Sequence, residues 1–285
     1  MRSEKPQSVA LPSRYPGGKN GAGVFQTIIN QIPPHDLYIE AFAGSASVLR
    51  KKAPAPCSIA IERDALTADR LRAASLPTST TVISGDAREF LSRREWTGRE
   101  FLYCDPPYVR SARRSPGSIY RFEFSDADHK ALLALLVRLP CAVMISGYRC
   151  ALYDEMLAGW RRLDFNAMTR GGPAVESLWM NYARPTILLD YRYLGRDFRE
   201  REKLKRRRTR WRARLERMPE LERQGLLDAL LELAAPKVAM PAGAGILSPV
   251  VARPPVAAMS AALAVDGEGI SPRSSSPVAA MPTSP

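Results

Sequence analysis

Residues 101–108 read Phe-Leu-Tyr-Cys-Asp-Pro-Pro-Tyr. A short apolar run followed at once by an acid and two prolines is typical of a buried strand that ends at a turn. Proline cannot donate a hydrogen bond to a sheet, so the strand cannot continue far beyond Cys104. We therefore predict a strand over 101–104, with Asp105 at its carboxyl end.

Other apolar runs of the same form alternate with helical patterns. We predict strands at 37–42, 58–61, 80–84 and 141–146, and helices at 47–52, 67–74 and 125–139. The last helix begins with the capping box Ser125-Asp126-Ala127-Asp128. Strand–helix alternation predicts an α/β fold with a doubly wound, mostly parallel sheet, and we expect 177–182 and 185–191 to close it as an antiparallel hairpin. Ligands of such sheets bind beyond the carboxyl ends of the strands, where Asp105 is expected to lie.

The composition limits the class of protein. Of the 285 residues 45% are hydrophobic and 25% charged, which is ordinary for a globular chain and excludes wholesale disorder. The chain has no apolar run of about 20 residues and no apolar core for a signal peptide near its start. Four cysteines without a CxxC pair and two histidines predict neither a disulfide framework nor a metal site, so we expect a cytoplasmic protein without metal.

The formal net charge of +13 favours a polyanionic partner. Residues 199–217 hold 11 Lys and Arg against 3 acids, and no Gly or Pro interrupts this stretch, which predicts a basic helix. A narrow apolar seam of Leu204, Trp211, Leu215 and Met218 is expected to dock on the domain or on a partner helix. The helix is then either a phosphate-contacting arm, with Lys205, Arg206, Arg207 and Arg208 as candidates, or a solvated helix that keeps the protein soluble.

The chain divides into four parts on these grounds. We expect a flexible N-terminus at 1–12, the α/β domain at 13–195, the basic helical extension at 196–233 and a disordered tail at 234–285. The tail holds 9 of the 24 prolines and no aromatic residue, so it cannot bury enough apolar surface to fold.

The tetrad at 105–108 is suited to holding an aromatic amine. The Asp105 carboxylate and the Pro106 carbonyl can accept both hydrogens of an exocyclic amino group, and Tyr108 offers a flat face for stacking. The alternative is a structural turn in which Pro106 and Pro107 end the strand and Asp105 binds its own backbone.

Three other motifs are weaker alone. Residues 39–47, Ile-Glu-Ala-Phe-Ala-Gly-Ser-Ala-Ser, place small residues after the first strand, where a ligand can approach the backbone closely. Glu62 and Asp86 end the next two strands and can bind ribose hydroxyls or cap helices. Residues 14–19, Arg-Tyr-Pro-Gly-Gly-Lys, form a tight turn that can direct Tyr15 and Lys19 into one cleft.

The order of these motifs resembles the D12 class of DNA adenine-N6 methyltransferases, the Dam-like family with α-group motif order. The resemblance spans about residues 13–195, includes 146–148 and 176–182, and is greatest to compact phage or prophage members. It implies the S-adenosylmethionine-dependent methyltransferase fold, S-adenosylmethionine as cofactor and duplex DNA with a flipped adenine as partner. The tetrad Asp105, Pro106, Pro107 and Tyr108 would hold the base.

The resemblance also implies a role for each cofactor-binding residue. Those around the cofactor would be Tyr15 and Lys19 in the cleft, Phe42, Gly44 and Ser45 beside the methionyl group, Glu62 at the ribose, and Asp86 at the cofactor adenine, with Asp105 adjoining.

The chain departs from the family in three places. Ala46 replaces the second glycine of the loop, and Ala41 replaces the usual proline. Only 18 residues separate Asp86 from Asp105, which leaves no room for a target-recognition domain. We expect residues 109–122 to take over that contact and to read a short or relaxed target; the candidates are Arg110, Arg113, Arg114 and Arg121. The alternative is that this segment is a mobile loop that contacts only the DNA backbone.

Other functions remain open at this point. The same tetrad could hold the amino group of cytosine, giving an N4-cytosine methyltransferase, and the substrate could be RNA. A non-catalytic DNA-binding protein on the same fold is the alternative from another class.

Overall fold

The computed structural model describes residues 17–113, 117–169 and 172–234. Seven strands form one sheet in the order β3-β2-β1-β4-β5-β7-β6. The strands are β1 Leu37–Ala41, β2 Cys57–Glu62, β3 Thr80–Ser84, β4 Glu100–Cys104, β5 Ala142–Gly147, β6 Arg161–Thr169 and β7 Gly172–Met180. The first five pair in parallel, and β7 runs antiparallel to both β5 and β6. The predicted doubly wound, mostly parallel sheet with a C-terminal antiparallel hairpin is confirmed.

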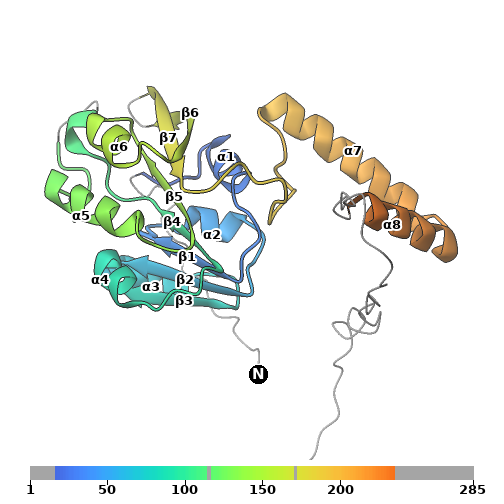
Figure 1. Ribbon diagram of the computed structural model, residues 1–285, viewed down its shortest axis with the longest axis horizontal. Coiled ribbons are helices and arrows are strands. Elements are labelled where there is room, and N and C mark those ends of the chain that lie inside the picture. The colour runs from blue at the N-terminus through green and yellow to red at the C-terminus, as the bar shows by residue number, and fades with distance from the viewer. Residues whose placement is uncertain (1–16, 114–116, 170–171, 235–285) are drawn as a thin grey trace, which may run out of the picture. The chain divides into compact units, whose positions relative to one another are not determined.

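Helices cover both faces of this sheet (Figure 1). They are α1 Val24–Ile29, α2 Ser47–Lys51, α3 Ala65–Ala73, α4 Ala87–Arg93, α5 Asp126–Leu136 and α6 Ala151–Met156, with a 3-10 turn at Arg110–Ala112. The predicted capping box is confirmed, because the Ser125 hydroxyl accepts from the Asp128 amide and the Asp128 carboxylate accepts from the Ser125 amide.

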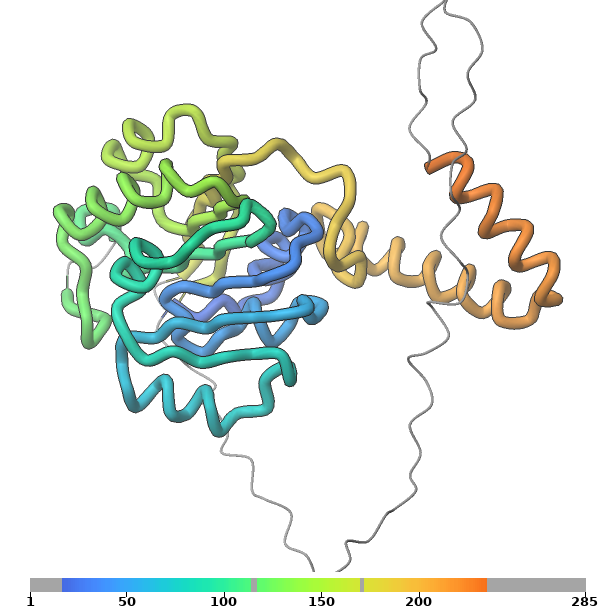
Figure 2. The backbone as a smooth tube through the Cα atoms, turned by 60° about the horizontal axis from the view of Figure 1, so that its bottom comes forward, coloured from blue at the N-terminus to red at the C-terminus, as the bar shows by residue number. Residues whose placement is uncertain are grey.

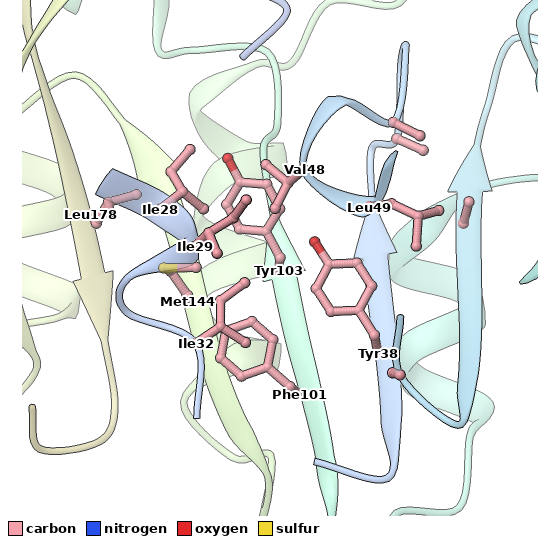
Figure 3. Close-up of a cluster of buried hydrophobic side chains, with 14 of the residues drawn as sticks. Ile28, Ile29, Ile32, Tyr38, Val48, Leu49, Phe101, Tyr103, Met144 and Leu178 are labelled. Carbon is pink, nitrogen blue, oxygen red and sulfur yellow. The ribbon is translucent and has the colours of Figure 1, made fainter. Parts of the chain in front are cut away.

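The core is split between the two faces because side chains alternate along each strand. Tyr38, Phe101 and Met144 point toward α1 and α2, where they pack with Ile28 and Ile29 (Figure 3). Their sequence neighbours Ile39, Leu102 and Val143 point to the opposite face, where they pack with the leucines of α4 and α5. Figure 2 shows β1, β2, β3 and β4 side by side, so their carboxyl ends share one edge.

The hairpin uses different strands from those expected. β7 pairs with β6, which precedes it, and residues 185–191 form no strand. Pro185 lacks a donor for a sheet ladder. The segment after it instead binds the loops that follow α1 and α2: the Leu189 amide donates to the Ile32 carbonyl, and the Asp190 carboxylate accepts from the Ala53 amide.

The predicted basic helix is observed as α7, Phe198–Glu216, and α8 follows at Glu220–Ala234. Contacts divide the chain into two units, Met1–Arg223 and Gln224–Pro285. No residue of α7 is buried and Trp211 is 52% exposed, so the expected docking of the apolar seam is not seen in the described chain. None of the described helices is both long and apolar enough to cross a membrane. The predicted N-terminal segment 1–12 and all of the predicted tail except Ala234 lie outside the described residues.

Candidate active site

A cavity opens at the shared carboxyl edge of β1, β2, β3 and β4. The sequence separates its lining residues widely, and the parallel pairing brings them together. The predicted site residues that line it are Lys19, Phe42, Gly44, Ser45, Glu62, Asp86, Asp105, Pro107 and Arg121. Tyr15, which we also expected in this cleft, lies outside the described residues.

The loop between β1 and α2 has an unusual backbone. Phe42, Gly44 and Ala46 have φ values of 61°, 53° and 48°, in the left-handed region that favours glycine. Two of these three residues carry a side chain, so the loop holds backbone strain beside the cavity. Ala46 is the position where the resemblance led us to expect glycine, and its conformation supplies the physical reason for that preference.

Glu62 holds this loop against the end of β2. One of its carboxylate oxygens accepts from the Gly44 amide at 2.8 Å, and the other accepts from the Asp64 amide at 2.8 Å. Burial raises the pKa of Glu62 even though these amides favour its charged form. Glu62 therefore stabilises the cavity wall through these two bonds, in addition to the ribose contact predicted for it.

Asp86 caps a helix and also lines the cavity. Its carboxylate accepts from the Arg88 and Glu89 amides at 2.8 and 3.4 Å, which makes it the N-cap of α4. The two interpretations of this acid, helix cap and ligand contact, are thus compatible.

Glu40 is a candidate that the sequence reasoning missed. It is buried in β1 and lines the cavity, and its Oε2 accepts from the Tyr38 hydroxyl at 2.8 Å and the Leu49 amide at 2.7 Å. Burial raises its pKa to about 7 against the effect of these donors. The available signal was an acid inside an otherwise apolar strand, where an unpaired charge is costly.

Asp105 is the centre of a buried polar network. Its Oδ1 lies 2.8 Å from the Lys19 ammonium and accepts from the Ser146 hydroxyl at 2.7 Å. Burial raises the pKa of Asp105, and the Lys19 charge opposes that rise. Among the described residues no hydrogen bond reaches the other oxygen, Oδ2, so one oxygen is held and one is free to accept.

Lys19 ties this network to Tyr108 and Glu176. Its ammonium donates to the Tyr108 hydroxyl at 2.8 Å and lies 3.6 Å from the Glu176 carboxylate, and Tyr108 donates to Glu176 at 2.9 Å. Burial alone would lower the pKa of Lys19, but the charges of Asp105 and Glu176 outweigh it and raise the pKa. Glu176 belongs to the stretch 176–182 that supported the resemblance, but its contact with Tyr108 was not foreseen.

Tyr108 is less accessible than its predicted role requires. Its side chain is 7% exposed, and its ring meets the Tyr148 ring edge-on with centroids 4.7 Å apart. The Lys19 ammonium lies 4.8 Å from the Tyr108 ring centroid. A base that stacks on Tyr108 must take the place of one of these neighbours.

The segment expected to read DNA forms part of the cavity wall. Arg113 makes two hydrogen bonds to Glu123 at 3.0 and 2.7 Å and a third to the Tyr108 carbonyl at 2.6 Å, and its side chain is 4% exposed. These bonds use its guanidinium inside the fold, so we withdraw Arg113 as a DNA contact. Tyr120 and Phe122, also from this segment, line the cavity.

The other arginine candidates differ from one another. Arg121 is exposed and pairs with Asp64 at 2.9 Å, and Arg110 is exposed in the 3-10 turn. Arg114 lies outside the described residues. Of the three candidates that the structure describes, Arg110 and Arg121 can reach a partner at the surface.

No protein-family model and no curated protein matches the chain. Solved structures that resemble it include precorrin 8w decarboxylase from Methanobacterium thermoautotrophicum, with 13% identity, a TM-score of 0.39 and coverage of 61% of this chain and 96% of that chain. Precorrin-6y C5,15-methyltransferase from Geobacter metallireducens has 12% identity and a TM-score of 0.38, covering 59% and 94%. A dimethyladenosine transferase from Plasmodium falciparum has 12% identity and a TM-score of 0.38, covering 58% and 62%. At these values the function has to be inferred from the site residues themselves.

Proposed function

We propose that the protein transfers a methyl group from S-adenosylmethionine to N6 of a flipped adenine in DNA. The observation that carries this proposal is the placement of Asp105 at the end of β4, beside a cavity lined by the β1 loop and by the acids that end β2 and follow β3. One oxygen of Asp105 is held inside the protein and the other can accept from a ligand.

The cavity residues fit S-adenosylmethionine. The molecule carries an ammonium, two ribose hydroxyls and an adenine amino group, all of which donate hydrogen bonds. Three of the carboxyl groups that line the cavity, those of Glu40, Glu62 and Asp86, can serve as the acceptors. We assign Glu62 to the ribose and Asp86 to the adenine amino group, as the resemblance implies, and add Glu40 as an acceptor for the ammonium.

The bound cofactor supplies a methyl group on a positively charged sulfur, which is already an activated donor. The protein's task is then to place a poor nucleophile in line with that methyl group. Asp105 Oδ2 and the Pro106 carbonyl would accept the two hydrogens of the adenine amino group and direct its lone pair at the methyl group. As the N–C bond forms and the C–S bond breaks, the amino nitrogen would release one proton to Asp105. Lys19 and Ser146 keep the Asp105 carboxylate from rotating, because both contact Oδ1.

A base inside a duplex cannot present its amino group to the cavity, so the target adenine would have to flip out of the DNA helix. Flipping costs a few kcal/mol, and stacking on an aromatic ring returns about 1–3 kcal/mol. Tyr108 is the ring beside Asp105, and the base would replace Tyr148 as its neighbour. Arg110 and Arg121 are the exposed cations among the described residues of the segment that follows the tetrad, residues 109–122.

The test is transfer of labelled methyl from S-adenosylmethionine to unmethylated duplex DNA, followed by nucleoside analysis. We expect N6-methyladenine from the wild type and none from Asp105→Ala, with cofactor binding retained in the variant because Asp105 forms only one part of the cavity wall. N4-methylcytosine would keep the mechanism and change the base. Cofactor binding without transfer would point to RNA or another substrate, and loss of both would favour a non-catalytic DNA-binding protein.

A further inference from the structure

Six of the basic residues of α7 lie on one face of the helix and form a stripe, which is not apparent from their order in the sequence. Six basic residues, Arg199, Lys203, Arg206, Arg207, Arg210 and Arg214, follow the spacing i, i+4, i+7, i+8, i+11 and i+15. At 3.6 residues per turn these intervals stay on one face about 100° wide and run for about 22 Å along the helix. All six side chains are exposed, and the three acids of α7 lie outside this stripe.

The stripe lacks the ion pairs that two of the four other basic residues of α7 make. Off the stripe, Lys205 pairs with Glu202 at 3.8 Å and Arg212 pairs with Glu216 at 2.8 Å. Within the part of the chain that the structure describes, no carboxylate pairs with any of the six stripe residues. The stripe also places like charges four residues apart, as in Arg199 with Lys203 and Arg206 with Arg210, which destabilises a helix.

We propose that this stripe is a binding surface for the phosphate backbone of duplex DNA. A helix that served only solubility would gain from acids between its basic residues, as the off-stripe pairs show. Phosphates that lie along this face would neutralise its positive charges and remove the repulsion between them. Each phosphate contact would also release a counterion, which favours binding. This inference rests on DNA as the partner in the proposed function but not on methyl transfer. Of the four predicted phosphate contacts, Arg206 and Arg207 belong to the stripe, whereas Lys205 and Arg208 do not. The stripe residues Arg199, Lys203, Arg210 and Arg214 take their place.

The experiment compares two full-length triple variants with the same loss of charge. The stripe variant carries Lys203→Gln, Arg206→Gln and Arg210→Gln, and the control carries Lys205→Gln, Arg208→Gln and Arg212→Gln. Affinity for a short labelled duplex is measured by anisotropy over a range of salt concentrations, and circular dichroism checks that α7 stays helical. We expect the slope of log affinity against log salt to lose about 2.7 in the stripe variant and less than 1 in the control.

Equal slope changes in the two variants would overturn the proposal. So would a stripe-dependent affinity for vesicles of anionic lipid, or for single-stranded RNA, that exceeds the affinity for duplex DNA. Methyl transfer is measured in parallel at low salt. DNA binding with the expected slopes but without transfer would uphold the stripe and reject the proposed function, whereas transfer with equal slopes would do the reverse.

Discussion

Removing the charge of Lys19 tests whether the buried network holds the site together. In Lys19→Met the ammonium that contacts Asp105, Tyr108 and Glu176 is lost while both carboxylates remain. Breaking a buried ion pair by removing one partner costs about 3–5 kcal/mol. The exposed fractions are 4% for Lys19 and 18% for Asp105. We therefore expect a loss near the lower end, about 3 kcal/mol in the free energy of unfolding.

Most of that loss should come from repulsion between the two remaining carboxylates. Both lie within 3.6 Å of the same ammonium nitrogen. The two oxygens nearest to this nitrogen are therefore no more than about 6.4 Å apart, which at an effective dielectric constant of about 20 corresponds to at least about 2.6 kcal/mol of repulsion. Adding Glu176→Gln removes this repulsion and keeps an oxygen that can accept from Tyr108. The double variant should thus regain about 2 kcal/mol, although it lacks one more charged group than the single variant.

Urea unfolding of the wild type, both single variants and the double variant measures this coupling. Glu176→Gln alone should cost less than about 1 kcal/mol, because its contact with Lys19 is longer than that of Asp105. If the double variant is no more stable than Lys19→Met, the two carboxylates do not interact through this network and the reasoning fails. Methyl transfer should fall in Lys19→Met, since an unpaired buried carboxyl takes up a proton and no longer accepts at both oxygens.

Three further predictions concern single residues around the site. The pKa of Glu40 is raised to about 7 by burial, so its folded form holds a proton that the unfolded chain releases; between about pH 4.5 and 7 the wild type should lose stability relative to Glu40→Gln, and parallel pH curves for the two would contradict this. Burial raises the pKa of Glu123, but hydrogen bonds from Arg113 and the loop amides outweigh burial and lower this pKa to about 2. The stability that Glu123 contributes is therefore present above about pH 4.5 and is lost toward pH 2, and acid unfolding of Glu123→Gln should lack this loss. Ala46→Gly should raise the free energy of unfolding by about 1 kcal/mol, because φ is 48° there, and a melting temperature below that of the wild type would show that the methyl group matters more than the backbone strain.

The strands around the site were predictable because each combines a short apolar run with a clear stop. β4 ends where Asp105 and Pro106 begin, and β3 has the predicted bounds Thr80–Ser84. β6 was missed because it is an edge strand whose alternating pattern begins with two arginines, Arg161 and Arg162. The expected pairing of 185–191 failed for the opposite reason. An apolar run looked like a strand, but its Leu189 amide and its Asp190 carboxylate bind the segments that follow α1 and α2.

The site was predictable in its members but not in their pairings. Asp105 and Lys19 are 86 residues apart in sequence, and only the folded sheet shows that Lys19 contacts the tetrad. In the same way, no local pattern separates Arg113, which is fixed to Glu123, from Arg121 and Arg110 at the surface. Sequence spacing identifies residues that can bind a partner, whereas their availability depends on which acids the fold brings near.

The network around Asp105 links stability to the chemistry that we propose. Lys19 balances the charge of the carboxylate before any ligand arrives, so a neutral amino group can be accepted at Oδ2 without leaving a buried charge unpaired. Without that cation the carboxyl would become protonated, and a protonated acid would present a donor to a group that also donates. The contact that fixes Asp105 in the fold is therefore also the contact that keeps it an acceptor, and a variant that weakens one property has to weaken the other.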